Sequence, residues 1–161
     1  MASGAPVRYE SGVHANYDVN FQIDVNGLQF QDDKPFPTAP KDIKDIESVS
    51  FSFDNGVEEW NPMDSKGWTK RFVTAKSISV SITAKRNEGD PGNDYIASKY
   101  MKKGESCYSL FLIEFPKGDC LKIPCVINVT SLGGDSTSID SMEFELLSHG
   151  EPEYIEDPSI V

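Results

Sequence analysis

The chain has 161 residues, a length typical of one domain, and its hydrophobic (38%) and charged (25%) fractions are those of a globular protein. Fifteen Lys and Arg stand against 26 Asp and Glu, which gives a net charge of −11 at pH 7. This acidity argues against a protein that grips nucleic acid, because such proteins neutralise phosphates with Lys and Arg. It does not exclude a surface past which nucleic acid merely slides.

Residues 1–17 are polar, have no sustained hydrophobic period, and are expected to form a loose N-terminal arm. They lack the basic and apolar regions of a signal peptide, and no apolar run approaches the ~20 residues of a membrane span. We therefore expect neither Sec-type secretion nor a membrane partner. Cys107, Cys120 and Cys125 form no C-x-x-C motif, which favours buried, reduced thiols.

The first predicted strand is Asp18–Val25, where apolar and polar residues alternate. Gln31–Pro40 follows as a long loop, because its three prolines oppose regular strand pairing. Asp45–Asp54 is the next strand, and Asn55-Gly56 is a turn signal that predicts its end. The clearest strand is Lys70–Lys85.

Two of these strands carry small hydroxyl side chains along one whole face, opposite an apolar face. The hydroxyl residues are Ser48, Ser50 and Ser52 in the first strand, and Ser77, Ser79, Ser81 and Thr83 in the second. A strand face in contact with water usually bears Lys, Glu or Gln. These two faces are therefore candidate functional surfaces.

Between them, a second long loop is predicted over residues 55–68, and it contains both tryptophans of the chain. Its large side chains are Trp60, Pro62, Met63 and Trp68. Such a loop either folds back over a small satellite core or docks on a neighbour, since Trp and Met are enriched in interface cores. The residues leave both alternatives open.

A helix is predicted at about 91–103, with Asp90 as N-cap, Pro91 at the first helical position and Gly104 as the stop. Asp90 and the acidic residues after it also suggest a calcium loop, but the EF-hand spacing is absent, so we expect no metal and no cofactor. The only histidines are His14 and His149, and a small hydrolase would need one of them beside a Cys or Ser in a pocket. We expect no catalytic residues.

Three further strands are predicted at Cys107–Phe115, Cys120–Thr130 and Ser138–Ser148, followed by an acidic, extended tail at 149–161. The whole is a mainly β (α+β) domain at 18–148, a β-sandwich or partly closed barrel with one flanking helix. Its charge is segregated along the chain: −8 over residues 1–65, +6 over 66–103 and −9 over 104–161. This order suits head-to-tail self-association, and equally suits strands that neutralise one another within the fold.

Several blocks, in this order, resemble the major tail tube proteins of long-tailed, siphovirus-type bacteriophages. They are Asp54 to Asp64, Gly67-Trp68, Ala75-Lys76-Ser77, Gly89 to Ala97, Asn128-Val129-Thr130, Gly133 to Thr137 and Glu143-Phe144-Glu145. They span about two thirds of the chain, whereas the terminal segments match less well.

The resemblance implies a structural virion protein without enzyme activity or cofactor, made in the bacterial host cytoplasm. Such protomers form hexameric rings that stack into a tube for DNA ejection. The implied partners are further copies of the chain, the tape-measure protein, the tail terminator and the baseplate or tail-tip proteins, while DNA passes without specific binding. Tubes of contractile tails are built from related folds and remain an alternative.

Within such a tube, the hydroxyl faces are candidate lumen linings, and Trp60, Pro62, Met63 and Trp68 are candidate inter-subunit anchors. We expect Lys70, Arg71 and Lys76 not to form a ring in the channel. The rival class is a monomeric β-sandwich module that binds carbohydrate through Trp60, Trp68 and Tyr108.

Overall fold

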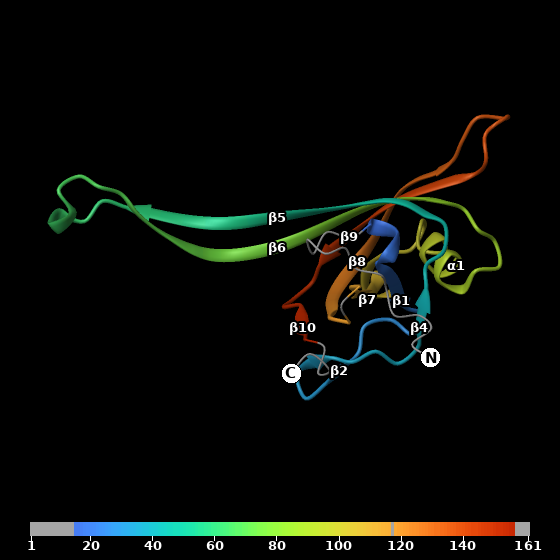
Figure 1. The fold of residues 1–161 in the computed structure, drawn as a ribbon, viewed down its shortest axis with the longest axis horizontal. Coiled ribbons are helices and arrows are strands. Elements are labelled where there is room, and N and C mark those ends of the chain that lie inside the picture. The colour runs from blue at the N-terminus through green and yellow to red at the C-terminus, as the bar shows by residue number, and fades with distance from the viewer. Residues whose placement is uncertain (1–14, 117, 157–161) are drawn as a thin grey trace.

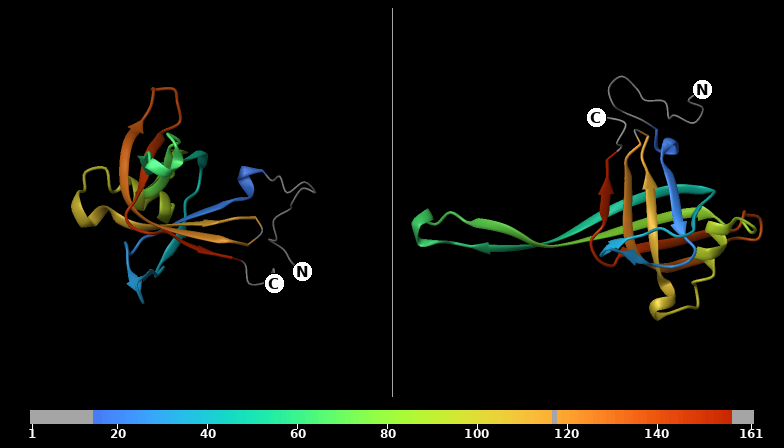
Figure 2. Two further views of the ribbon diagram at one scale, coloured as in Figure 1. Left: turned by 90° about the vertical axis from the view of Figure 1, so that its left-hand side faces the viewer. Right: turned by 90° about the horizontal axis from the view of Figure 1, so that it is seen from below.

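The computed structural model describes residues 15–116 and 118–156. It is mainly β with one α-helix, as predicted, and every strand pairing is antiparallel. One curved sheet has the order β4-β1-β7-β8-β9-β6-β5, and within the described residues it does not close into a barrel (Figures 1 and 2). The main strands are β1 (Asn20–Asp24), β4 (Pro40–Asp42), β5 (Ile46–Trp60), β6 (Lys70–Lys85), β7 (Tyr108–Glu114), β8 (Cys120–Gly133), β9 (Ser141–Ser148) and β10 (Glu153–Ile155).

The core lies on the concave face of this sheet. β-Branched, Leu and Phe side chains that point to one face of β6 to β9 fill it, and Ile96 of helix α1 (Pro91–Ala97) adds to it. The largest fully buried side chains are Phe111, Phe144, Ile23, Ile82, Ile113, Ile123, Met142 and Leu146. The helix therefore covers one flank of a single core, as the sequence predicted.

Strand β8 is the centre of the sheet because it pairs with three others. Its residues 120–126 pair with β7, and its residues 125–133 pair with β9. β10 pairs with residues 120–122 on the edge that β9 uses farther along, so β9 and β10 follow one another beside β8. Within the tail predicted at 149–161, the structure shows a paired strand at β10, whose Tyr154 hydroxyl donates to the Asp119 carboxylate; residues 157–161 lie outside the described part.

The most prominent feature is a long β5–β6 hairpin that projects from the body (Figure 1). From Ser79 to Lys85, β6 also pairs with β9, but from Lys70 to Ile78 its only strand partner among the described residues is β5. We call residues 53–78 the arm. Almost all of its side chains are exposed.

The arm corrects the prediction that Asn55-Gly56 ends the strand. β5 continues to Trp60, and the glycine lies at a bulge between the pairs Gly56–Ala75 and Val57–Val73. Strand pairing can continue through a turn signal when the facing strand supplies partners on both sides of it. A bulge then takes up the extra residue. The predicted loop shrinks to residues 61–69, which form the tip and contain the 3₁₀ turn η2 (Met63–Ser65).

The proline-rich loop and the helix also differ from prediction. Two short strands, β2 (Phe30–Gln31) and β3 (Lys34–Pro35), pair within the segment expected to be irregular. The helix ends at Ala97, not at 103, because the backbone N–H groups of Lys99 and Tyr100 bond carbonyls three residues back, as in a 3₁₀ turn. The predicted N-terminal arm lies outside the described residues up to residue 14, and η1 (Asn16–Asp18) begins shortly after it. Another 3₁₀ turn, η3 (Gly104–Cys107), precedes β7.

Candidate functional site

The structure brings the two predicted hydroxyl faces together on one surface. Ser48 lies opposite Thr83, Ser50 opposite Ser81 and Ser52 opposite Ser79 in the β5–β6 register. Directly paired residues point to the same side of a sheet, so these side chains form two adjacent rows, which Ser77 continues. Ser79 and Thr83 are half-buried, and the others are exposed.

This hydroxyl surface extends over β9 and β8. Glu145 lies between Ser81 and Asn128, and Glu143 lies between Thr83 and Ser131. Neither glutamate forms an ion pair with another described residue. The sequence analysis did not identify either glutamate as a site residue. Their alternation with buried Phe144 could have predicted that both lie on the polar face of a strand.

The opposite face of the same strands is apolar and faces the core. Val80 and Ile82 of β6 are buried there beside Phe144 and Leu146 of β9. The sheet segment β5-β6-β9-β8 therefore has one side committed to the fold and one polar side presented to the surroundings.

Both edges of this four-stranded segment are open among the described residues. β5 pairs only with β6 along its whole length, and residues 127–133 of β8 pair only with β9. Unpaired backbone N–H and C=O groups on such edges are templates for another strand. β5 is 15 residues long, so its edge is unusually extensive.

The four predicted anchor residues lie together at the end of the arm. Trp60 closes β5 and is 46% exposed, Trp68 is 80% exposed, and Met63 is fully exposed. Pro62 is half-buried, and its carbonyl accepts bonds from the backbone N–H (3.2 Å) and hydroxyl (2.9 Å) of Ser65. The tip is thus hydrogen-bonded internally and presents its largest side chains outward, which excludes a satellite core beneath it.

More apolar surface lies along the arm than the sequence analysis assigned. Phe53 is 64% exposed and Phe72 is 65% exposed, and Val57 and Val73 lie opposite each other with about half of each exposed. Strand alternation predicted an apolar face correctly but could not tell that the strands extend beyond the core.

The three basic residues on the β6 strand of the arm lie away from the hydroxyl rows. Arg71 pairs with Glu59 at 2.7 Å, and the Lys76 ammonium donates to the Asn55 amide oxygen at 3.2 Å. Lys70 lies opposite Trp60 at the base of the tip. These groups are spread along the arm and do not gather into a patch.

The acidic motif at the helix start holds the fold together. The Asp90 carboxylate accepts from the backbone N–H groups of Asn93 and Lys44, both at 3.1 Å, which confirms the predicted N-cap. Arg86 donates to Asp94 at 2.7 Å, and this hydrogen bond holds the pKa of the carboxyl below its usual 3.8. No group of three or more His, Cys, Asp or Glu suited to a metal occurs in the described residues.

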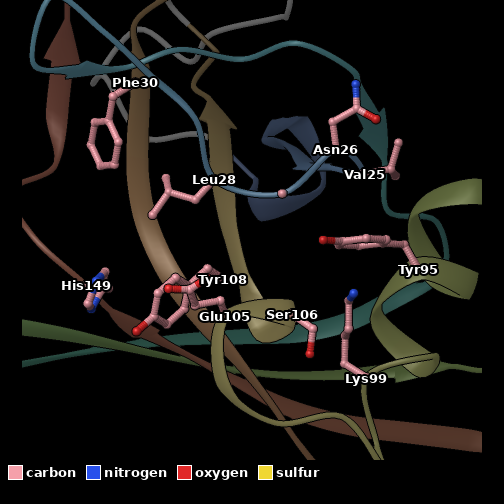
Figure 3. Close-up of a pocket in the computed structure, with 11 residues that line it drawn as sticks. Val25, Asn26, Leu28, Phe30, Tyr95, Lys99, Glu105, Ser106, Tyr108 and His149 are labelled. Atoms are coloured by element: carbon pink, nitrogen blue, oxygen red, sulfur yellow. The ribbon is translucent and has the colours of Figure 1, made fainter.

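The described residues show no His placed to activate a Ser or Cys nucleophile, as a hydrolase would need. The His149 ring stacks on Tyr108 at 4.5 Å, beside a pocket that Tyr95 and Lys99 line on its other side (Figure 3). No hydrogen bond joins the His149 ring to a described Ser or Cys, and His14 lies outside the described residues. Burial raises the pKa of the Cys125 thiol to about 12, which disfavours the reactive thiolate.

The carbohydrate alternative needs one aromatic platform. Trp60 and Trp68 flank the arm tip, whereas Tyr108 begins β7 in the body, so these three rings do not form a common surface (Figure 1).

Within the described residues, no helix has the length and apolar character that crossing a membrane demands.

Comparisons with known proteins agree on the fold. No protein-family profile and no curated protein matches the sequence. The structure is similar to a chain from the tail of an empty gene transfer agent particle with C6 symmetry: the TM-score is 0.71, the identity is 15%, and the match covers 89% of this chain and 100% of that chain. A chain from the virion of the native gene transfer agent matches with a TM-score of 0.68 at 14% identity over the same shares. The protein therefore has a fold that occurs in the tail of such a particle.

Proposed function

We propose that this protein is the major tail tube subunit of a siphovirus-type phage or phage-like particle. Six copies form a ring, rings stack into a tube, and the tube conducts DNA during delivery. The C6-symmetric tail neighbour and the motif resemblance support this assignment. The protein acts as a structural component of the virion tail, without a cofactor or a catalytic step.

The observation that carries the proposal is the four-stranded segment with a polar face and two open edges. In a ring, the outer edge of β5 pairs with residues 127–133 of β8 in the next copy. Repeated around the ring, this contact joins the segments into one continuous cylinder and leaves no exposed strand edge.

The hydroxyl surface of this cylinder faces the channel. Serine and threonine side chains offer DNA neither cationic anchors nor bulky obstacles, and Glu143 and Glu145 add negative charge that repels phosphates. Lys70, Arg71 and Lys76 lie farther out on the arm and contribute no cationic ring. DNA is then a passenger and not a ligand.

The arm connects neighbouring copies, with Trp60, Pro62, Met63 and Trp68 as anchors. Rings at the ends of the tube contact the tail terminator and the baseplate or tail-tip proteins, and the lumen holds the tape-measure protein during assembly. Synthesis takes place in the host cytoplasm.

Size-exclusion chromatography followed by negative-stain microscopy tests the assignment. We expect rings or tubes with sixfold symmetry from the purified chain, or from the chain expressed with a tail-tip nucleus. A compact monomer in both preparations would contradict the proposal.

A further inference from the structure

The arm tip carries large side chains that nothing in the described chain covers. Trp68 is 80% exposed and Met63 is fully exposed. Tryptophan is enriched among the residues that dominate binding energy at protein interfaces. It contributes most when its ring enters a desolvated pocket on the partner. The tip therefore requires a matching apolar hollow on another molecule.

A hollow of suitable chemistry lies at the root of the arm. Its volume is about 650 Å³, and Phe53 and Ile78, which face each other across β5 and β6, form its apolar wall. Pro152 and Glu151 of the link between β9 and β10 form the other side. An apolar wall with a polar rim is the usual composition of an interface pocket.

The charges of tip and root are complementary. The link and β10, residues 149–156, contain Glu151, Glu153 and Glu156 and no Lys or Arg. The tip, residues 61–69, together with the adjoining Lys70 contains two lysines against one aspartate. The root pocket also contains Lys76, whose ammonium donates to the Asn55 amide oxygen at 3.2 Å on the β5–β6 side, so Lys66 approaches from the side of the link, where Glu151 lies.

The position of the two surfaces makes the contact head-to-tail. Tip and root lie at opposite ends of the same two strands, so a tip cannot reach the root of its own arm. Figure 1 shows that the arm projects well away from the body, so a copy displaced along the arm can bring its tip to its neighbour's root. A contact between two different patches of identical copies builds an open filament when, as for copies displaced along the arm, its repetition does not close into a ring.

We propose that the arm tip of one copy docks into the root pocket of a second copy, with Trp68 against Phe53 and Pro152 and Lys66 beside Glu151. The inference rests on the proposed tube and identifies the surface that receives the arm. The occupant is a second copy of this chain.

Cysteine cross-linking tests the contact. Tubes of the double variant Lys66→Cys with Glu151→Cys should give, after mild oxidation, a ladder of covalent multimers on a non-reducing gel. The matched pair Lys66→Cys with Glu105→Cys, at the rim of the pocket in Figure 3, should give none. Tubes that yield no ladder from the first pair, or equal ladders from both, overturn the docking and leave the tube proposal standing.

A charge exchange covers the case in which the cysteine variants do not assemble. Lys66→Glu and Glu151→Lys should each raise the protein concentration needed for tube formation by about tenfold, and the double variant should restore it. A double variant as defective as the single ones overturns the docking. Wild-type protein that never forms tubes overturns the proposed function, and the docking with it.

Discussion

Gly92 of helix α1 packs closely against the backbone of β4. A Cβ atom there would lie 2.3 Å from the Asp42 carbonyl oxygen, a backbone atom of β4. We expect Gly92→Ala to lower the free energy of unfolding by about 1–3 kcal/mol, because backbone must shift to admit the methyl group. Urea unfolding of the monomer measures it. Gly134→Ala is the control, since its Cβ would meet nothing closer than 3.7 Å; equal losses in both variants would contradict this account.

Asp94 gives the helix start a pH-dependent ion pair. The Arg86 hydrogen bond lowers its pKa below 3.8, and the Gly89 backbone N–H acts in the same direction, against a smaller opposing effect of burial. Because the pKa is lower in the folded state, the stabilisation is complete above the unfolded value and is lost as pH falls through the folded one. Nuclear magnetic resonance titration should show an Asp94 midpoint below 3.8 that rises in Arg86→Gln. An unchanged midpoint in that variant would disprove the role of Arg86.

At the scale of elements, the arm tip should separate folding from assembly. We expect the double substitution Trp60→Ala and Trp68→Ala to change monomer stability by about 0.5 kcal/mol or less, because much of both side chains is already exposed. Polymerisation should be lost, since anchors of this kind contribute about 2 kcal/mol or more each. Circular dichroism and electron microscopy measure the two effects. Tyr100→Ala, an exposed aromatic on the body, should assemble normally; tubes from the double variant would refute the anchor assignment.

Local sequence signals predicted the elements that depend on local physics. The inner half of β6, from Ser77 to Ala84, follows from an unbroken alternation of apolar and hydroxyl residues, and the helix start follows from the Asp90 cap and Pro91. The two hydroxyl faces were also visible from the sequence, whereas the residues of the loop predicted over 55–68 left open whether it was exposed or folded over a small core. These features need no knowledge of what lies across the sheet.

The rest depends on pairing between distant segments. β5 passes through Asn55-Gly56 because β6 faces it residue by residue, and no local pattern encodes that partner. Glu143 and Glu145 join the hydroxyl surface only through the β6–β9 register. Three residues of β10 become a strand because β9 ends and leaves an edge of β8 unoccupied. The open edges themselves are properties of strand order, which the sequence does not reveal.

At the scale of the whole molecule, the acidic hydroxyl surface should keep DNA from binding. We expect wild-type tubes not to co-sediment with double-stranded DNA, and tubes of Glu143→Lys with Glu145→Lys to retain it in a salt-dependent manner, because lysines release counterions from DNA. The control, Glu88→Lys with Glu105→Lys, has the same net charge but changes residues outside the hydroxyl surface. Equal retention by both variants would count against a lumen position for Glu143 and Glu145.

β5 and β6 run from the core to the tip, so the length of this hairpin fixes the distance between the root and the tip. The same two strands contribute a wall of the core, an open lateral edge and the arm, so in the tube with the proposed tip-to-root contact the number of residue pairs between root and tip sets the axial repeat. Each added pair lengthens a strand by about 3.4 Å and also exchanges its two faces. Tubes with a longer repeat can therefore be designed only by inserting pairs two at a time, in steps of about 7 Å.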